Sequence, residues 1–333
     1  MALENSALAT AGRAIAVKTL LAAKGQALGL RLVAGAKHIG KLIKVSEVNR
    51  PGLALGGHLE NYRSERVQII GRGEHAFCTK ESKSGKVRGE LLNNLVIMLS
   101  QPDTPCVVVT AGLKAPTVLV QACNKARVPL FETGLDTSDF VGELSAFLEE
   151  ELALVTRIHG VLVDVYGLGV LIQGDAGIGK SECALELVKR GHILVADDIV
   201  EIQRKRGNML MGRCPSMLKH YMEVRGLGII DVELLFGVGA IKEHTRIEMG
   251  VRLIGVNEKT YCDRTGLEQT CVEILGVEIP SLCIPVTPGR NLAVLIEVAA
   301  LNQRLKSQGI FAANEFNNRL INKMKGAGRS GLI

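Results

Sequence analysis

A glycine-rich loop is the most chemically informative stretch of this 333-residue chain. Residues 174–181 read Gly-Asp-Ala-Gly-Ile-Gly-Lys-Ser and match the Walker A pattern at every required position. The glycines let backbone N–H groups wrap a phosphate, Lys180 can reach the outer phosphates, and the Ser181 hydroxyl can ligate magnesium. We therefore predict a nucleotide site formed by Gly174, Asp175, Ala176, Gly177, Ile178, Gly179, Lys180 and Ser181.

Two adjacent aspartates follow the loop at an informative distance. Asp197 and Asp198 end a predicted strand, and Asp197 comes sixteen residues after Ser181. A Walker B strand lies beside the loop at the carboxyl edge of such a sheet. Neighbouring side chains of an extended chain point in opposite directions, so one carboxylate can face the phosphates while the other faces another partner. A solvated turn is the alternative, but the spacing favours a catalytic or metal role. Spacing alone leaves His159 unassigned.

The elements around the loop have the order that the motif requires. A β-rich stretch at 157–165, a turn at 166–169 and a buried strand at 170–173 precede the loop, and a helix at 181–189 follows it. Because a strand precedes the loop and a helix follows it, phosphate binding is favoured over a chance glycine turn. A second strand at 193–196 then leads into the two aspartates.

The first half of the chain alternates short β-rich runs with helical stretches, which predicts a separate α/β domain. The order helix, strand, helix, strand near its end is typical of a small parallel sheet. A helix at 137–154, with Thr137 or Ser138 as N-cap, leads into the next domain, so we place the boundary near residue 150. Residues 1–150 form the first domain and residues 151–333 the second. The predicted strands of the first are 67–70, 106–110 and 128–131, and the helices between them are 88–100 and 115–126.

Composition narrows the class of protein. Hydrophobic residues make up 47% of the chain and charged residues 22%, as in folded globular proteins. The net charge of +6 is spread along the chain, so we predict no nucleic-acid partner. The eight cysteines lack the short paired spacings of a zinc or redox site, which favours a reducing, cytoplasmic location. No apolar run approaches the roughly 20 residues that span a bilayer, so we expect no membrane association.

Several further stretches carry more specific information than the loop. They are His-Gly-Val-Leu-Val-Asp at 159–164, Tyr-Gly-Leu-Gly-Val-Leu-Ile at 166–172, Leu-Val-Ala-Asp-Asp at 194–198, Glu-Val-Arg-Gly-Leu-Gly-Ile-Ile-Asp at 223–231, Cys-Asp-Arg at 262–264, Pro-Val-Thr-Pro-Gly-Arg-Asn-Leu at 285–292 and, upstream, residues 45–55 with Asn49-Arg50-Pro51-Gly52. With the Walker A loop, they closely resemble the bacterial HPr kinase/phosphorylase family over most of the chain.

The resemblance implies an α/β fold in which an N-terminal domain for assembly or regulation precedes a P-loop kinase domain of the carboxykinase-like type. It implies that ATP, or in some members pyrophosphate, phosphorylates a regulatory serine of the phosphocarrier protein HPr with Mg²⁺ as cofactor. Inorganic phosphate removes the group again and yields pyrophosphate. A homohexamer is the family expectation, and in relatives the C-terminal helical region, predicted here at 291–308, meets a neighbouring subunit.

The resemblance also assigns roles to individual residues. Lys180 and Arg264 would neutralise phosphate charge, and Ser181 and Glu223 would hold magnesium. One of Asp197 and Asp198 would take the serine proton while His159 interacts with the pair; Asp198 is favoured, although the sequence does not decide between them. The family signature would comprise Glu223, Arg225, Gly226, Gly228 and Asp231, and the loop for the dephosphorylating direction Pro285, Val286, Thr287, Pro288, Gly289 and Arg290.

One departure and three rival functions bear on this interpretation. Ala176 stands where many family members carry serine, which removes a side-chain contact to phosphate and favours the kinase direction over phosphorolysis.

A small-molecule phosphotransferase or carboxykinase would have similar pocket chemistry, but the 223–231 stretch argues against it. A nucleotide-sensing module without phosphate transfer would not need the acids, His159 and Arg264. A eukaryotic-type protein kinase is excluded because no H-R-D or D-F-G run occurs.

Overall fold

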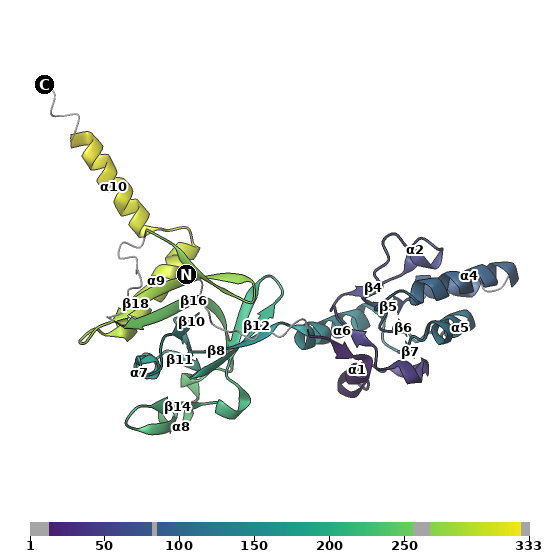
Figure 1. Cartoon of the computed structure of the whole chain (residues 1–333), viewed down its shortest axis with the longest axis horizontal. Helices are drawn as coiled ribbons and strands as arrows, with labels where there is room; N and C mark the ends of the chain where they lie inside the picture. The colour runs from purple at the N-terminus through teal and green to yellow at the C-terminus, as the bar shows by residue number, and fades with distance from the viewer. Residues whose placement is uncertain (1–12, 82–84, 256–266, 328–333) are drawn as a thin grey trace. The chain divides into compact units, whose positions relative to one another are not determined.

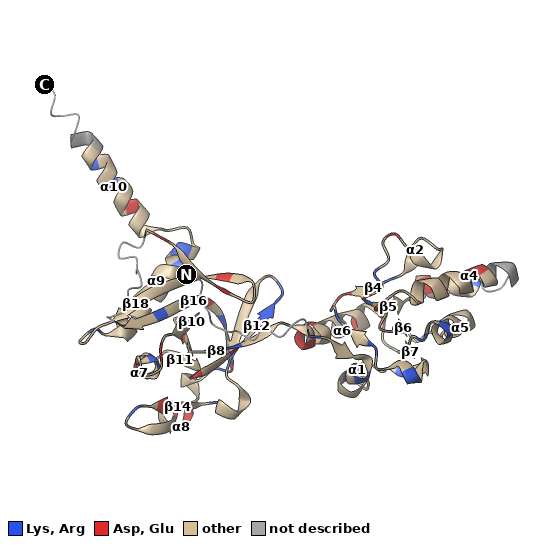
Figure 2. Cartoon of the chain, viewed as in Figure 1, with Lys and Arg blue, Asp and Glu red and all other residues tan. Residues whose placement is uncertain are grey.

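The computed structural model describes residues 13–81, 85–255 and 267–327 and divides into two compact units (Figure 1). One unit ends at Ala153 and the other begins at Leu154. Each has its own sheet and its own hydrophobic core. Basic and acidic residues are interspersed along both units (Figure 2). None of the helices formed by the described residues combines the length and the apolar character needed to cross a membrane.

The N-terminal unit is built on a mainly parallel sheet with the strand order β2-β7-β6-β5-β4. The strands from β4 to β7 run parallel, and β2 pairs antiparallel with β7 at one edge. A ribbon of β1 and β3 lies outside this sheet. The bounds are β1 Ile15–Ala16, β2 Arg31–Ala34, β3 Leu42–Ile43, β4 Val48–Asn49, β5 Val67–Ile70, β6 Val107–Val109 and β7 Leu130–Glu132.

Helices cover both faces of this sheet, so its strands are buried on both sides. Val107 and Val109 belong to one core cluster and Val108 to the other, as the twofold alternation of a strand requires. The first cluster packs under α2, α3, α4 and α5, and the second under α1 and α6. The bounds are α1 Val17–Lys24, α2 Gly52–Leu55, α3 Arg72–Glu81, α4 Gly85–Leu99, α5 Thr117–Ala126 and α6 Thr137–Leu152. The predicted parallel α/β domain is therefore confirmed.

The C-terminal unit contains a larger mixed sheet with the order β11-β9-β10-β16-β13-β12-β8. The long strand β16 also pairs with β18, which pairs with β17. Its strands are β8 Val155–His159, β9 Val161–Val165, β10 Leu168–Gln173, β11 Ile193–Ala196, β12 Ile199–Lys205, β13 Met209–Arg213, β16 His244–Gly255, β17 Thr270–Ile274 and β18 Val277–Val286. The strands β14 Tyr221–Val224 and β15 Gly228–Asp231 form a separate hairpin.

Strand direction places several loops at one edge of this sheet. β10, β16 and β18 are parallel neighbours, and β11 runs the same way because both β11 and β10 are antiparallel to β9. The glycine-rich loop follows β10, the two aspartates follow β11, and residues 287–290 follow β18. The helices are α7 Lys180–Lys189, α8 Val232–Phe236, α9 Leu292–Ser307 and α10 Ala312–Ala327, and α7 and α9 share a core cluster with β9, β10 and β16.

Two local predictions are corrected by the structure. The β-rich stretch 157–165 is two strands that belong to different parts of the sheet, separated at Gly160. The N-cap of α6 is Asp136, and the Thr137 hydroxyl instead lies 2.7 Å from the Thr110 hydroxyl, because a tertiary partner replaces the local one.

Candidate active site

The glycine-rich loop connects β10 to α7 and depends on backbone positions that exclude side chains. A Cβ atom at Gly174 would lie 2.7 Å from the Leu253 carbonyl oxygen on the neighbouring strand. Gly179 has φ +102° and is the N-cap of α7, without a side-chain hydrogen bond to the helix end. Asp175 and Ala176 are exposed, whereas Ile178 packs against the core. The first N–H groups of α7 are therefore not capped by a side chain.

The basic group of the loop lies over its own backbone. Lys180 Nζ donates to the Gly174 carbonyl oxygen at 2.8 Å and to the Asp175 carbonyl oxygen at 2.9 Å. These bonds hold the ammonium group at the loop, where a nucleotide phosphate would bind. The geometry therefore supplies one fixed positive charge beside the uncapped helix end.

Asp197 lies inside the site and contacts the loop helix. Its carboxylate accepts a hydrogen bond from Ser181 Oγ at 2.9 Å and one from the Glu223 backbone N–H at 3.2 Å. The side chain is buried, and this burial raises the pKa of Asp197; the neighbouring Asp198 charge acts in the same direction, while the bond from Ser181 opposes it. Asp197 thus joins the Walker A serine to the hairpin.

Asp198 has the opposite environment. Its φ is +67°, an uncommon value for aspartate, and its side chain is 71% exposed. Pairing of β8 with β12 places His159 opposite Ile199, and the Gly160 N–H donates to the Asp198 carbonyl oxygen at 3.0 Å. As a result, His159 Nδ1 lies 3.6 Å from Asp198 Oδ1, with the histidine side chain 82% exposed. Both side chains of this pair are therefore largely exposed to solvent.

The 223–231 stretch lies in the hairpin β14–β15. Arg225 lies against the glycine-rich loop, because a Cβ atom at Gly177 would be 3.6 Å from its Nη1. The Glu223 side chain is exposed, and the backbone N–H of the same residue donates to Asp197. Asp231 caps α8, since its carboxylate accepts from the Leu234 N–H at 2.9 Å. Gly226 lies in the hairpin turn and Gly228 begins β15, with φ of +89° and +86°.

The 285–290 stretch leaves the same sheet edge. Pro285 and Val286 end β18, and residues 287–290 make a turn in which the Arg290 N–H donates to the Thr287 carbonyl oxygen at 3.2 Å. Gly289 has φ +80°, as its position in a turn after Pro288 requires. Arg264, together with Cys262 and Asp263, lies outside the described residues.

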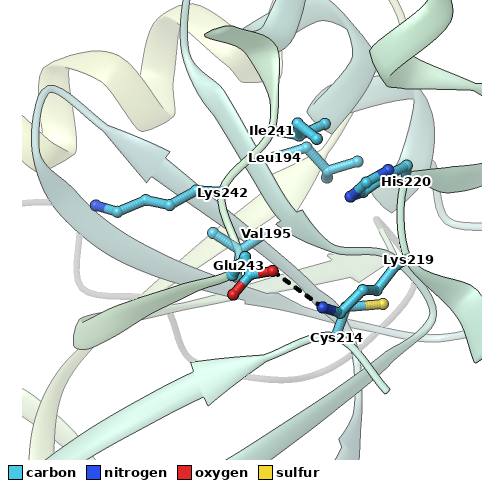
Figure 3. A pocket seen from close by; sticks show the side chains of 8 residues that line it. All are labelled: Leu194, Val195, Cys214, Lys219, His220, Ile241, Lys242 and Glu243. Carbon is cyan, nitrogen blue, oxygen red and sulfur yellow. Dashed lines mark hydrogen bonds and ion pairs between the residues drawn. The ribbon is translucent and has the colours of Figure 1, made fainter. Parts of the chain in front are cut away.

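A small hollow lies behind strand β11 (Figure 3). It is lined by Leu194, Val195, Cys214, Lys219, His220, Ile241, Lys242 and Glu243. Its lysines are already paired, Lys219 with Glu243 at 3.2 Å and Lys242 with the buried Asp164 at 2.7 Å. Burial raises the pKa of Cys214 to about 11, helped by the nearby Asp197 charge, so its thiol is a poor nucleophile at neutral pH.

Two family models together match most of the chain. The model described as HPr Serine kinase N terminus matches residues 15–148, and the model described as HPr Serine kinase C-terminal domain matches residues 150–320. The chain therefore belongs to the HPr serine kinase family. It is a protein-serine kinase/phosphorylase that phosphorylates and dephosphorylates a serine of HPr, with ATP as the phosphoryl donor. This membership excludes the small-molecule kinase and the non-catalytic sensor as alternatives.

Solved structures include one related protein of the same kind. The HPr(Ser) kinase/phosphatase from Coxiella burnetii is 37% identical, with 48% of this chain and 97% of that chain covered at a TM-score of 0.44. The CBS and DRTGG domains of a Clostridium perfringens pyrophosphatase, complexed with the activator diadenosine tetraphosphate, match at 13% identity, 39% and 45% coverage and a TM-score of 0.24. Neither superposition is close enough to carry a structural argument, so membership rests on the family models and on sequence identity.

Proposed function

We propose that Asp198, with His159 beside it, is the proton-handling group for the serine of HPr, while Asp197 serves the phosphate side of the site. The observation that carries this division is the contrast between the two aspartates: one is buried on Ser181, and the other is exposed beside a histidine. A protein serine can reach only the exposed carboxylate. In the kinase direction Asp198 takes the hydroxyl proton as the serine oxygen attacks the outer phosphate of ATP.

The reverse direction uses the same groups. Inorganic phosphate takes the phosphoryl group from phosphoserine, pyrophosphate forms, and Asp198 returns the proton to the serine oxygen. His159 Nδ1 lies 3.6 Å from Asp198 Oδ1, so a protonated His159 would favour the ionised carboxylate. The 287–290 turn, at the same sheet edge, would bind the incoming phosphate through the Thr287 hydroxyl and the Arg290 guanidinium.

Charge on the phosphates would be neutralised by groups from several elements. The loop amides, Lys180 and the uncapped end of α7 face the phosphate position, and Arg225 reaches the loop from the hairpin. Arg264 keeps this role as a prediction from the family resemblance.

The donor set at Ser181 suits magnesium. The Ser181 hydroxyl lies 2.9 Å from the Asp197 carboxylate. The backbone N–H of Glu223 donates to the same carboxylate, and the Glu223 side chain is exposed. Mg²⁺ prefers oxygen ligands and usually takes only one or two protein carboxylates, with phosphates and waters completing its shell. We propose Ser181, Asp197 and Glu223 as its protein neighbours. When bound, the ion would neutralise phosphate charge.

Assembly and location complete the proposal. We propose a homohexamer, and the exposed apolar side chains of Val298, Phe316 and Met324 on α9 and α10 are suited to contacts with neighbouring subunits. The N-terminal unit would serve assembly or regulation. A cytoplasmic location stays a prediction.

The test follows phosphoserine on HPr by intact-mass spectrometry. Purified protein, Mg²⁺, ATP and HPr should give a mass gain of one phosphate, and Lys180→Ala and Asp198→Asn should each abolish it. An HPr variant with the target serine replaced by alanine controls for other acceptor sites. Adding phosphate should then reverse the gain and release pyrophosphate. Full activity of Asp198→Asn would overturn the assignment of the base.

A further inference from the structure

The glycine-rich loop and the 287–290 turn are each followed by a helix, and the two helices pack together. α7 follows the loop, α9 follows the turn, and both contribute buried residues to one core cluster. Leu187 of α7 and Ile296 of α9 are both fully buried in this cluster. The packing of α9 on α7 therefore anchors the chain that follows the turn.

Asn291, the residue that joins the turn to α9, has two bonds. Its Oδ1 accepts from the Val294 N–H at 3.0 Å, which caps α9. Its Nδ2 donates to Glu186 Oε1 on α7 at 2.6 Å. The bond to Glu186 is the principal cause that lowers the pKa of Glu186, and Arg190 adds to it, so the acceptor is a carboxylate at neutral pH. One side chain thus ends the turn, begins α9 and binds α7.

A second set of bonds continues the connection. Arg190 pairs with Glu186 at 3.1 Å and with Glu297 of α9 at 3.3 Å. His192 Nε2 lies 2.9 Å from Glu297 Oε1, and these two side chains are only 4% and 13% exposed. Because His192 and Glu297 are largely buried, their contact holds α9 against the end of α7 whether or not Asn291 is present. Asn291 then sets where the turn itself lies.

We propose that Asn291 is a positioning residue for phosphorolysis: through Glu186 it holds the 287–290 turn beside the phosphate loop, where Thr287 and Arg290 bind the incoming inorganic phosphate. The inference rests on the proposed role of this turn. Phosphoryl transfer depends chiefly on positioning and charge, so a small shift of the turn weakens phosphate capture. ATP carries its own phosphates into the glycine-rich loop, so the kinase direction depends less on the turn.

The two atoms of the Asn291 amide allow the cap and the interhelical bond to be separated. Asn291→Asp keeps the oxygen that caps α9 but places a carboxylate against Glu186. Adding Glu186→Gln restores a donor and an acceptor in the reverse order. Asn291→Ser keeps a capping hydroxyl but cannot reach Glu186, and Glu186→Gln should not rescue it. Asn93→Asp, an exposed change on α4 of the other unit, controls for the added charge.

The measurements are kcat/KM for phosphate with phosphorylated HPr and kcat/KM for ATP with HPr. Asn291→Asp and Asn291→Ser should lower the first about tenfold, mainly through KM for phosphate, and change the second less than about twofold. The Asn291→Asp, Glu186→Gln pair should recover most of the loss. Equal losses in both directions, no loss, no rescue, or a wild-type enzyme that phosphorylates HPr without any phosphorolysis would each overturn the proposal. Failure of the wild type to phosphorylate HPr would instead contradict the proposed function.

Discussion

At the carboxyl edge of each sheet a helix begins just after a parallel strand, but the protein's own side chains occupy the start of that helix in only one of the two units. In the N-terminal unit, Glu74 accepts from the Gly71 N–H at 3.1 Å and from Arg50 at 3.0 Å, so a carboxylate of the unit occupies the start of α3. In the C-terminal unit, α7 begins at Gly179 with no side-chain cap. The first edge is closed by its own side chains, and the second keeps its helix end open for phosphate.

The difference shows that a parallel sheet edge becomes a site only where the chain withholds its own capping groups. At the carboxyl edge of the N-terminal unit's sheet, the hydroxyls of Thr110 and Thr137 form a hydrogen bond, and Arg72 pairs with Asp136. At the open edge of the C-terminal unit's sheet, the side chains of Asp198 and His159 are more than two-thirds exposed. Substitutions at matched positions of the two edges should therefore have different kinds of effect.

The largest expected effect is on catalysis at the open edge. Asp198→Asn should lower kcat for HPr phosphorylation by about 10²–10⁴-fold, because the serine loses its proton acceptor. The matched change Asp136→Asn, at an exposed acid of the closed edge, should alter kcat less than about twofold. Steady-state phosphorylation of HPr measures both. A comparable loss in the two variants would erase the distinction between the edges.

The next effect is on stability at the closed edge. Glu74→Ala leaves the Gly71 N–H and Arg50 without their buried acceptor, and should lower the free energy of unfolding by about 1–3 kcal/mol. Glu74→Gln keeps an acceptor oxygen and should lower it less. Since the chain contains no tryptophan, urea unfolding is best followed by far-UV circular dichroism. Unchanged stability of the alanine variant would show that the edge is not held by this carboxylate.

A smaller, pH-dependent effect should have opposite signs at the two edges. Burial acts to raise the pKa of Glu74, but the bonds from Arg50 and the backbone outweigh it and the pKa is lowered. The free energy of unfolding of wild type therefore exceeds that of Glu74→Gln above the ordinary glutamate pKa, and this difference is lost as pH falls through the lowered pKa.

At Asp197 burial raises the pKa, so the contribution is present below the ordinary aspartate pKa and lost as pH rises through the raised value. Asp197→Asn should therefore gain stability relative to wild type as pH rises above about 4, the ordinary aspartate pKa. Urea unfolding of wild type and both variants, from acidic pH below the ordinary carboxyl pKa values up to neutral pH and in EDTA, tests the contrast. Parallel pH trends for the two substitutions would contradict it.

The smallest expected effect concerns the departure in the loop. Ala176→Ser restores a hydroxyl at an exposed loop position and should raise the rate of phosphorolysis about two- to tenfold, the effect of one added hydrogen bond. Ala176→Gly adds no hydroxyl and should not raise it. Pyrophosphate release from phosphorylated HPr measures the rate. A wild-type enzyme whose phosphorolysis already matches its kinase rate would show that the hydroxyl is dispensable.

Local spacing predicted much of the fold. Strands β5 and β11 were predicted at their observed bounds, and the helices α4, α5 and α7 within a few residues, because hydrophobic periodicity and glycine positions act over short distances. The division of 157–165 into two strands was not predictable. Both halves are β-rich, and only their pairing with distant strands separates them at Gly160.

The sequence by itself determined the family, through local motifs that the family models match, and it predicted the phosphate loop, because an eight-residue stretch carries every group that such a loop needs. It did not determine which aspartate is buried, because that depends on Ser181 and the Glu223 amide meeting Asp197. Nor did it reveal the contact between Glu186 and Asn291, which are 105 residues apart. Such contacts arise only when strand register and helix packing bring distant segments together, and these are properties of the whole fold.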